Sequence, residues 1–497
     1  MQLRRLVSLS ALYGLSSIIG RVINWALTPY FVHQFSLSDF GAFSDLYAWI
    51  FYPQIILTIG LETSFFRFSQ TAELAAKNYA NAVWSIFLVT CCFGIVVFGF
   101  DTAIAESLGY KNKPEWVLLV AGIIIIDCLS ALPLAKLRYD QKTQQFVATS
   151  LINIAVTLLL SIFFVTTLSM GVTGALLANL IASVIRLFCS LYQNLPDPFE
   201  LSLSQARQIV RYGSFIMMAG LIGSLNETLD RNLLPRLWKT NWYMGEIKTG
   251  LELNAIYSAN YKLGMIISLV SQAFRYAAEP IFFKNIQHKN SRTFLARSFF
   301  YFLLFCLVAF FLVSSFSFEI ISFRFWGLSS KSLLPEAYWV GINVIPLILL
   351  ANVCLAAYYQ LSIWFKATGQ LRFGLFFSAI GAFITVVGNV LLIPHFGFMA
   401  CAWVTLVCYF VMVILCYQIG QRYYFVPYPA KRIIIYSVLL VAASLLNQSL
   451  TTVGATHIGE LILKIIISAF VLGIIGLLEY KKPVLWPEPA GNHTENN

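Results

Sequence analysis

Ionisable residues interrupt several strongly apolar runs of this 497-residue sequence. Lys262 lies about nine residues inside the run 254–275, roughly 13 Å from the nearer end of a helix. Arg21 and Asn24 are spaced i, i+3 and therefore share one helix face. A charge at such depth normally faces a partner or a water-filled cavity. If both faces line one cavity, Arg21 and Lys262 supply positive charge that binds an anion; a Lys262 that snorkels outward is the plainer alternative.

Four further charged residues have both a functional and a structural interpretation. Asp127, in VLLVAGIIIIDCLS, has no charged neighbour in sequence. It binds a coupling ion or proton, or it is a neutral acid satisfied by a neighbouring helix. Glu62, the second candidate for a coupling ion, is expected to pair with Arg67. Arg67 and Arg275 would add two cations at the cytoplasmic mouth of the cavity, where membrane orientation also predicts arginines.

A polar stretch, SLNETLDRNLLP, ends one of the most apolar runs in the chain. Glu227 and Arg231 are i, i+4 and can neutralise one another, and Asn226 and Asp230 form an adjacent stripe. Counted from the cytoplasmic end of the run, Asp230 lies about 30 Å along the helix, at the outer boundary of the membrane. We expect a partly paired polar patch there, or a purely structural ion pair.

The elements that position these residues are membrane-spanning helices. A chain with 59% hydrophobic and 11% charged residues is not soluble, and apolar stretches of about 20 residues recur throughout. We predict an all-α, polytopic membrane protein with about 14 transmembrane helices. The runs lie at about 6–30, 41–66, 79–99, 115–135, 147–168, 171–192, 211–231, 254–275, 296–318, 339–362, 373–394, 398–419, 433–448 and 459–479.

The basic residues predict the orientation of the chain. With the N-terminus in the cytoplasm, 22 of the 33 basic residues lie inside and eight outside, which satisfies the positive-inside rule. The first run lacks a convincing signal-peptide cleavage site, so we expect it to be retained. An even number of spans returns the C-terminus to the cytoplasm.

Several classes of function are excluded by composition and spacing. The net charge of +11 comes from scattered residues rather than a basic stripe, so we expect no nucleic-acid partner. The nine cysteines lie in apolar runs without metal-ligand spacing, and the five histidines are dispersed. We therefore expect no metal, no cofactor and no enzymatic activity.

Landmarks recur in the same order two hundred residues apart. Tyr-Gly opens the first and seventh runs and a proline closes each; GAFSDLY and LETSFFRF in the second run match NAIYSANY and LVSQAFRY in the eighth. Six spans per repeat make the halves parallel, with a cleft between two lobes. The expected division is 1–192 for the N-lobe, 193–210 for a cytoplasmic linker, 211–420 for the C-lobe, 421–482 for two extra helices and 483–497 for a cytoplasmic tail.

These segments resemble a known family. GAFSDLY, LETSFFRF, LDRNLLP and above all AIYSANYKLGMIISLVSQAFRYAAEPIFF are similar to the polysaccharide-type (O-antigen unit) flippases of the multidrug/oligosaccharidyl-lipid/polysaccharide exporter superfamily. These proteins are MATE-like and related to lipid II flippases. The resemblance covers nearly the whole chain. It implies two lobes that alternate between inward-open and outward-open states, in a multi-pass protein of the bacterial inner membrane.

The resemblance also implies a cargo and its binding residues. The cargo would be an undecaprenyl-pyrophosphate-linked oligosaccharide, flipped from the cytoplasmic to the outer leaflet for polysaccharide and lipopolysaccharide synthesis. By position in helices 1 and 8, Arg21 and Lys262 match the cleft cations that bind pyrophosphate in lipid II flippases. A second arginine at the end of helix 1 has no counterpart in NWALTPY, which weighs against lipid II itself. Tyr47 and Tyr261 would stack on sugars or form an interfacial belt, and Asn24 and Asp230 would face the outer cleft.

Two alternatives belong to other classes. A cation-coupled drug exporter of the same superfamily should favour cleft carboxylates over cations, because its cargo is usually cationic. A membrane-embedded glycan polymerase or acyltransferase would carry a large folded external loop, and the longest one here, 232–253, is too short. We expect a monomer whose partners are the lipid-linked oligosaccharide, membrane lipids and a coupling proton or Na⁺.

Overall fold

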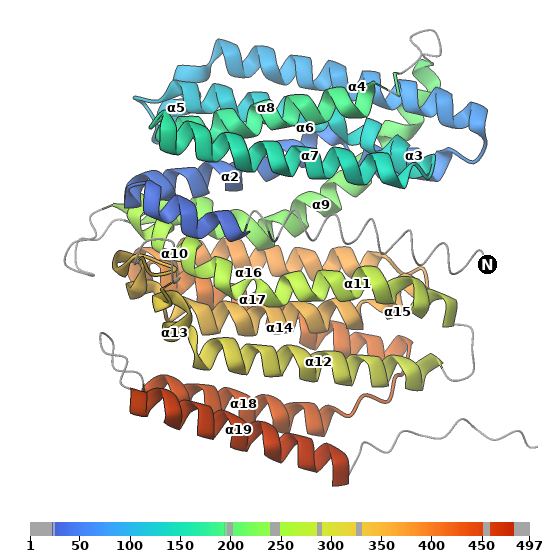
Figure 1. The fold of residues 1–497 in the computed structure, drawn as a ribbon. Helices are drawn as coiled ribbons and strands as arrows, with labels where there is room; N and C mark the ends of the chain where they lie inside the picture. The colour runs from blue at the N-terminus through green and yellow to red at the C-terminus, as the bar shows by residue number, and fades with distance from the viewer. Residues whose placement is uncertain are drawn as a thin grey trace, which may run out of the picture. The chain divides into compact units, whose positions relative to one another are not determined.

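The structure is a computed structural model, and it describes residues 22, 25–192, 194–195, 202–238, 249–285, 291–324, 331–450 and 458–481. Within these ranges the fold is helical, and the sole extended pairing is an isolated bridge between Arg324 and Ser332 (Figure 1). The all-α prediction is confirmed.

The helices follow one another along the chain in the order shown in Figure 1. They are α2 (Leu37–Thr58), α3 (Leu61–Phe68), α4 (Ala72–Gly99), α5 (Asp101–Ser107), α6 (Pro114–Tyr139), α7 (Thr143–Ile162), η1 (Phe163–Thr167), α8 (Gly171–Leu191), α9 (Leu203–Leu237), α10 (Gly250–Gly264), α11 (Ile266–Asn285), α12 (Ser291–Ser315), α13 (Ser317–Ser322), η3 (Glu336–Gly341), α14 (Val344–Leu361), α15 (Ile363–Ala367), α16 (Arg372–Phe396), α17 (Phe398–Tyr423), α18 (Ala430–Ser449) and α19 (Ile458–Lys481).

Eleven helices in the described part of the chain are long and apolar enough to cross a membrane. Each coincides with one of the predicted runs. Of the other three runs, 6–30 lies mostly outside the described residues, and 41–66 and 254–275 are each divided into two helices. The chain is therefore a multi-pass membrane protein, and the count of 14 spans stays a prediction.

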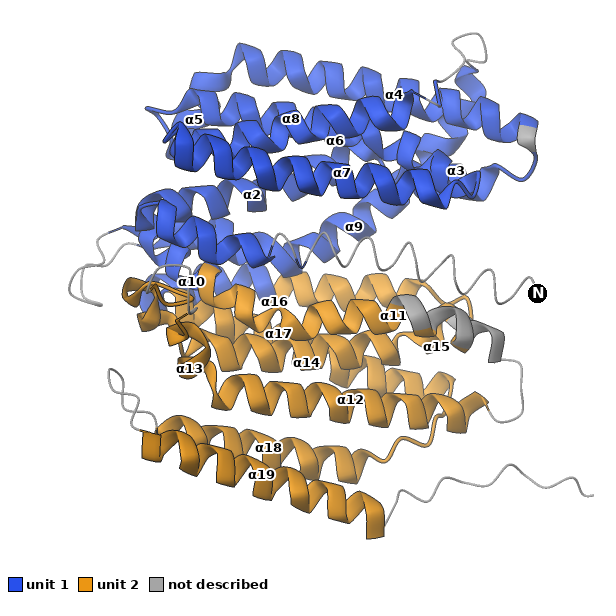
Figure 2. Cartoon of the chain, in the orientation of Figure 1, with its two compact units in different colours: residues 1–258, 385–397 blue, residues 259–384, 398–497 orange. Residues whose placement is uncertain are grey.

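The chain forms two compact units, coloured separately in Figure 2. Unit 1 comprises residues 1–258 and 385–397; in it α6 packs on α4 and α8, and α9 packs on α2, α3 and α4. Unit 2 comprises residues 259–384 and 398–497; in it α14 packs on α11, α12 and α17, and α12 packs on α18. The boundaries between the units fall inside α10, inside α16, and between α16 and α17.

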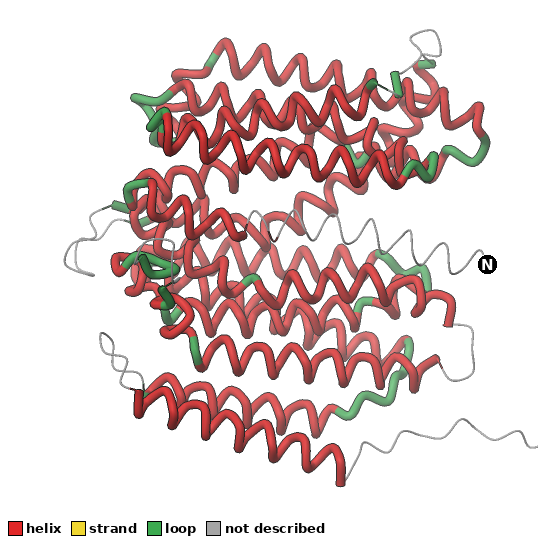
Figure 3. The backbone as a smooth tube through the Cα atoms, viewed as in Figure 1, coloured by secondary structure: helices red, strands yellow, loops and turns green. Residues whose placement is uncertain are grey.

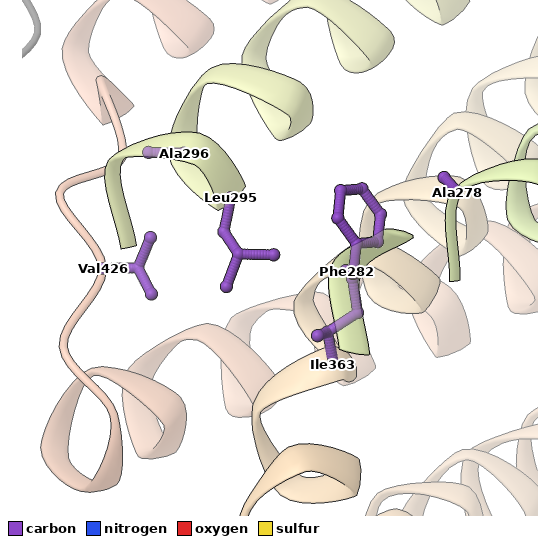
Figure 4. Close-up of a cluster of buried hydrophobic side chains, with 6 residues drawn as sticks. All are labelled: Ala278, Phe282, Leu295, Ala296, Ile363 and Val426. Atoms are coloured by element: carbon purple, nitrogen blue, oxygen red, sulfur yellow. The ribbon is translucent and has the colours of Figure 1, made fainter. Parts of the chain in front are cut away.

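Most of the described backbone is helical, so most of its polar groups are hydrogen-bonded within helices (Figure 3). This is what hydrocarbon requires, because it offers no hydrogen-bond partner. A buried apolar cluster holds the far end of α11 in unit 2 (Figure 4). Its members come from α11, α12, α15 and the segment before α18: Ala278, Phe282, Leu295, Ala296, Ile363 and Val426.

The second apolar run is broken by a left-handed turn in unit 1. Ile59 and Gly60 adopt φ angles of 50° and 63° between α2 and α3. The turn packs closely on α9, because a Cβ added at Gly213 would lie 2.2 Å from the Ile59 carbonyl oxygen. Only a glycine at position 213 lets the two backbones approach this closely.

We expect Gly213→Ala to destabilise the protein, since the added methyl group collides with backbone rather than with a mobile side chain. Overpacking of this kind costs about 1–3 kcal/mol. Gly223→Ala is the matched control on the same helix, because nothing lies within 4 Å of its added Cβ. Thermal unfolding of the purified variants in detergent should show a lower midpoint for Gly213→Ala alone; equal midpoints would contradict the close contact.

Candidate functional site

Lys262 lies beside the interruption of the eighth predicted span. It occupies the last turn of α10, is half-buried, and is followed by a turn at Met265 before α11 begins. The C-terminal end of a helix carries partial negative charge, which favours a cation at this position. The helix end therefore favours a charged amine at this position.

The interruption at Lys262 is anchored to α14 in unit 2. Asn352 donates from Nδ2 to the Gly264 carbonyl oxygen over 3.0 Å and to the Ile348 carbonyl oxygen over 2.9 Å. A Cβ at Gly264 would lie 2.5 Å from Ile348 Cγ2, so the backbone of α10 packs directly against α14 at this point. The amide thus supplies a hydrogen bond that satisfies a carbonyl at the break in the helix.

A buried ion pair joins α2 to α9 in unit 1. The Asp45 side chain is fully buried, and Arg236 donates to it from Nη1 and Nη2, each over 2.9 Å. Asn232 Nδ2 and the Tyr110 hydroxyl donate to the same carboxylate over 2.9 and 2.7 Å. Arg236 also donates to the carbonyl oxygens of Asn232 and Leu108. A bidentate pair with this many extra bonds is the arrangement that a buried carboxylate needs.

Sequence reasoning missed this ion pair. Asp45 lies within the GAFSDLY landmark, and Arg236 is one of the eight basic residues that the predicted orientation places outside. The sequence shows an acid at the start of one apolar run and a base after the end of another. It does not show that the two residues pair, because that depends on the packing of α2 on α9.

The outer polar stretch of α9 also faces its neighbours in unit 1. Asp230 is buried and accepts a hydrogen bond from the Tyr257 hydroxyl of α10. The Thr228 hydroxyl donates to the Tyr52 hydroxyl of α2 over 2.9 Å, and Asn226 is buried while Glu227 is exposed. Most of the stretch therefore packs against neighbouring helices.

The segments matched by the repeat are in contact where α2 and α10 begin. Asn254 Nδ2 donates to the Gly41 carbonyl oxygen over 3.0 Å. A Cβ at Gly41 would lie 1.9 Å from the Leu251 carbonyl oxygen. Together with the Asp45 ion pair and the Asp230 bond, this contact links α2, α9 and α10 at one end. These contacts are called the polar seam below.

Asp127 has partners on two neighbouring helices of unit 1. Arg186 of α8 forms an ion pair with it, and Gln54 of α2 donates to its Oδ2 over 3.0 Å. About two helical turns away along α2 and α8, Asn179 Nδ2 donates to the Tyr47 hydroxyl over 2.6 Å. One carboxylate thus connects α2, α6 and α8.

The predicted pairing of Glu62 with Arg67 is wrong. Glu62 forms its ion pair with Arg138 of α6 over 2.7 Å, because residues five apart on a helix point roughly 140° away from one another. The Arg67 guanidinium lies instead over the Tyr212 ring, 4.3 Å from its centroid. Arg275, its match in the repeat, lies 4.5 Å from the ring centroid of Tyr359 in unit 2.

The remaining predicted residues are only partly placed. Arg21 and Asn24 lie outside the described residues, so the structure gives no distance from Arg21 to Lys262. Tyr47 is half-buried, Tyr261 is buried, and Arg231 is half-buried on α9. The described residues contain no cluster of His, Cys, Asp or Glu that suits a metal ion.

Comparison with solved structures identifies the fold. The lipid II flippase MurJ in its inward closed conformation matches with a TM-score of 0.72 at 14% identity, over 95% of this chain and 99% of that one. An inward-facing MATE family multidrug resistance transporter of the MOP superfamily matches with a TM-score of 0.62 at 14% identity, over 84% and 96%. A MATE in complex with MaD3S matches with a TM-score of 0.59 at 14% identity, over 87% and 99%.

Comparison of the sequence identifies the family. No curated protein matches this chain. The family model described as "Polysaccharide biosynthesis protein" matches residues 7–286, which is more than half of the sequence. The chain therefore belongs to the polysaccharide biosynthesis protein family, with the fold of MOP-superfamily transporters that the resemblance predicted.

Proposed function

We propose that this protein is a transporter that flips an undecaprenyl-pyrophosphate-linked oligosaccharide from the cytoplasmic to the outer leaflet. The observation that carries the proposal is Lys262, a half-buried cation at the anchored interruption of α10 and α11. Membership of a polysaccharide biosynthesis family and the fold of a lipid II flippase support it. Pyrophosphate carries negative charge that hydrocarbon does not solvate, so a cation within the span lowers the barrier to its passage.

In this proposal Arg21 joins Lys262 in binding the pyrophosphate, while the lipid tail stays in the bilayer. The lobes are residues 1–192 and 211–420, both termini are cytoplasmic, and the protein works as a monomer in the bacterial inner membrane. Arg67 and Arg275 hold positive charge near the cytoplasmic entrance. The polar positions Asn24, Glu227 and Arg231, with Tyr47 and Tyr261, line the saccharide path near the outer end.

With these lobes, the polar seam is the outer gate. Its contacts from α2 of one lobe to α9 and α10 of the other must break when the outer end opens, whereas the Asp230–Tyr257 bond lies within the second lobe and can persist. The Asp45 carboxylate has four donor contacts from three side chains, which makes it the strongest part of the seam. A gate built from an ion pair opens at a defined free-energy cost and closes in a single geometry.

Asp127 is the proposed coupling carboxylate, and Glu62 is the weaker candidate. Protonation of Asp127, or Na⁺ bound to it, would release Arg186 and Gln54 and so loosen α8 and α2 from α6. A switch of this kind acts inside the N-lobe. It links the ion gradient to the helix that carries the Asp45 side of the gate.

A cation-coupled drug exporter is the alternative function. It needs carboxylates that face a cationic cargo, but Asp45, Asp127 and Asp230 each already accept from a neighbouring side chain. This arrangement favours an anionic cargo.

We expect Lys262→Ala to reduce glycan export roughly ten- to hundredfold, the effect of losing one hydrogen bond to a charged group. Lys262→Arg should retain most of the export, because the charge remains. Lys111→Ala is the control, since Lys111 is 74% exposed and its partner is a surface glutamate. Surface glycan measured in cells at equal protein levels checks this; full export by Lys262→Ala would rule out the cationic site.

We expect Asp127→Asn to abolish the dependence of transport on the coupling ion, since Asn cannot ionise. Reconstituted vesicles with an imposed proton or Na⁺ gradient provide the measurement. Arg186→Gln should instead leave the coupling in place, because it removes only the partner of the carboxylate and keeps the ionisable group. A gradient response that is unchanged in Asp127→Asn would make the ion pair structural.

We expect Asp45→Asn and Arg236→Gln to open the outer gate, because breaking a buried pair costs about 3–5 kcal/mol. Hydrogen exchange of residues 41–52 and 228–237 should increase in both variants. The apolar double variant Asp45→Leu with Arg236→Leu should exchange less than either, since no buried charge is left unpaired. Glu73→Gln, at an exposed surface pair, serves as the control and should leave exchange unchanged. Equal exchange in all variants would refute the gate.

A further inference from the structure

Unit 2 contains a groove between α11 and α12 that the proposed transport path does not use. Its volume is about 640 Å³, and residues from both helices line it. Those that carry the argument are Ala273 and Phe274 on α11, and Phe294, Arg297, Tyr301 and Phe305 on α12. The volume is within the roughly 300–1,000 Å³ typical of sites for small ligands.

The aromatic walls of the groove are held in place by packing. The rings of Phe274 and Phe302 stack with centroids 4.0 Å apart and planes 18° apart. Phe294 lies edge-on to Phe282, which belongs to the buried cluster at the end of α11. Tyr301 and Phe305 are 44% and 57% exposed, so their apolar surface is available to a ligand. The groove is therefore a firm apolar surface rather than a loose gap.

The charged side chain that lines the groove, Arg297, lies toward one end. Arg297 lies about 9 Å along α12 from its first residue, and Phe305 lies about 12 Å further on. Within the described part of the chain, no carboxylate forms an ion pair with Arg297, which is exposed. A ligand with an anionic head and a hydrocarbon tail matches both the charge and the length of this surface.

The sequence indicates which side of the membrane the charged end faces. Residues 280–297 contain four basic residues and no acidic residue, which the positive-inside rule assigns to the cytoplasm. Basic pockets between transmembrane helices on this side favour anionic lipid head groups. We propose that the groove binds one anionic phospholipid of the cytoplasmic leaflet, with its phosphate at Arg297 and one acyl chain along the aromatic walls.

The bound lipid has a consequence for the candidate site. α11 is the half-helix that follows the interruption at Lys262, and the groove lies against the first half of this half-helix, at residues 270–274. A lipid seated there would stabilise α11 against α12. The composition of the inner leaflet would then influence the stability of the broken helix without contact with the cargo.

The experiment uses the purified full-length protein in detergent, titrated with phosphatidylglycerol or phosphatidylcholine and observed by native mass spectrometry. We expect phosphatidylglycerol to bind more tightly, and Arg297→Gln to weaken it about fivefold, the effect of one cation near an anionic lipid. Arg297→Lys should retain the binding. Ala273→Phe should block the acyl chain and weaken both lipids, although the charge remains.

Arg292→Gln is the matched control, because it removes the same charge from an exposed position outside the groove, where the guanidinium lies 5.2 Å from the Tyr424 ring centroid. Its effect should be clearly smaller than that of Arg297→Gln, because the removed charge does not face the groove. An effect equal to that of Arg297→Gln would mean diffuse surface attraction and would overturn the site. Equal binding of both lipids by the unaltered protein would also overturn it. So would undecaprenyl phosphate that binds at Arg297 where phosphatidylglycerol does not, since the groove would then serve the carrier lipid.

Discussion

Hydrocarbon neither hydrogen-bonds a peptide group nor solvates a charge, and both units are organised around this constraint. It explains why the described chain is helical and why its two interrupted spans are packed so closely. At Ile59 and Gly60 the turn lies against the backbone of α9 at Gly213. At Gly264 the side chain of Asn352 donates to the carbonyl oxygen at the break. Each irregular segment is covered by protein.

The same constraint accounts for the ion pairs. In unit 1, Asp45 and Asp127 each meet an arginine from another helix, and Asp230 meets a tyrosine hydroxyl. In unit 2, Lys464 of α19 is 1% exposed, and its Nζ lies 2.6 Å from Glu319 Oε1 of α13. Such pairs add little net stability over apolar packing, but removing one partner is expensive. They therefore specify which helices meet and suit a protein that changes between two defined arrangements.

Lys262 stands in a different setting from these acids. It is placed at the end of a half-helix whose terminal carbonyl groups favour positive charge. The cation lies next to the break in the backbone between α10 and α11. This position is the physical basis for proposing an anionic cargo for a member of a polysaccharide biosynthesis family.

The sequence alone determined the properties that depend on composition along one segment. Hydropathy predicted each of the eleven spans, because about 20 apolar residues in a row have few other structures available. The landmark segments also predicted the family and its fold. Only the tertiary structure determined which charged side chains form ion pairs with one another. Glu62 meets Arg138 rather than Arg67, and Asp127 meets an arginine 59 residues away. Hydropathy reports how long a helix is, but in lipid nearly every face is apolar, so the sequence pattern does not show which face packs on which neighbour.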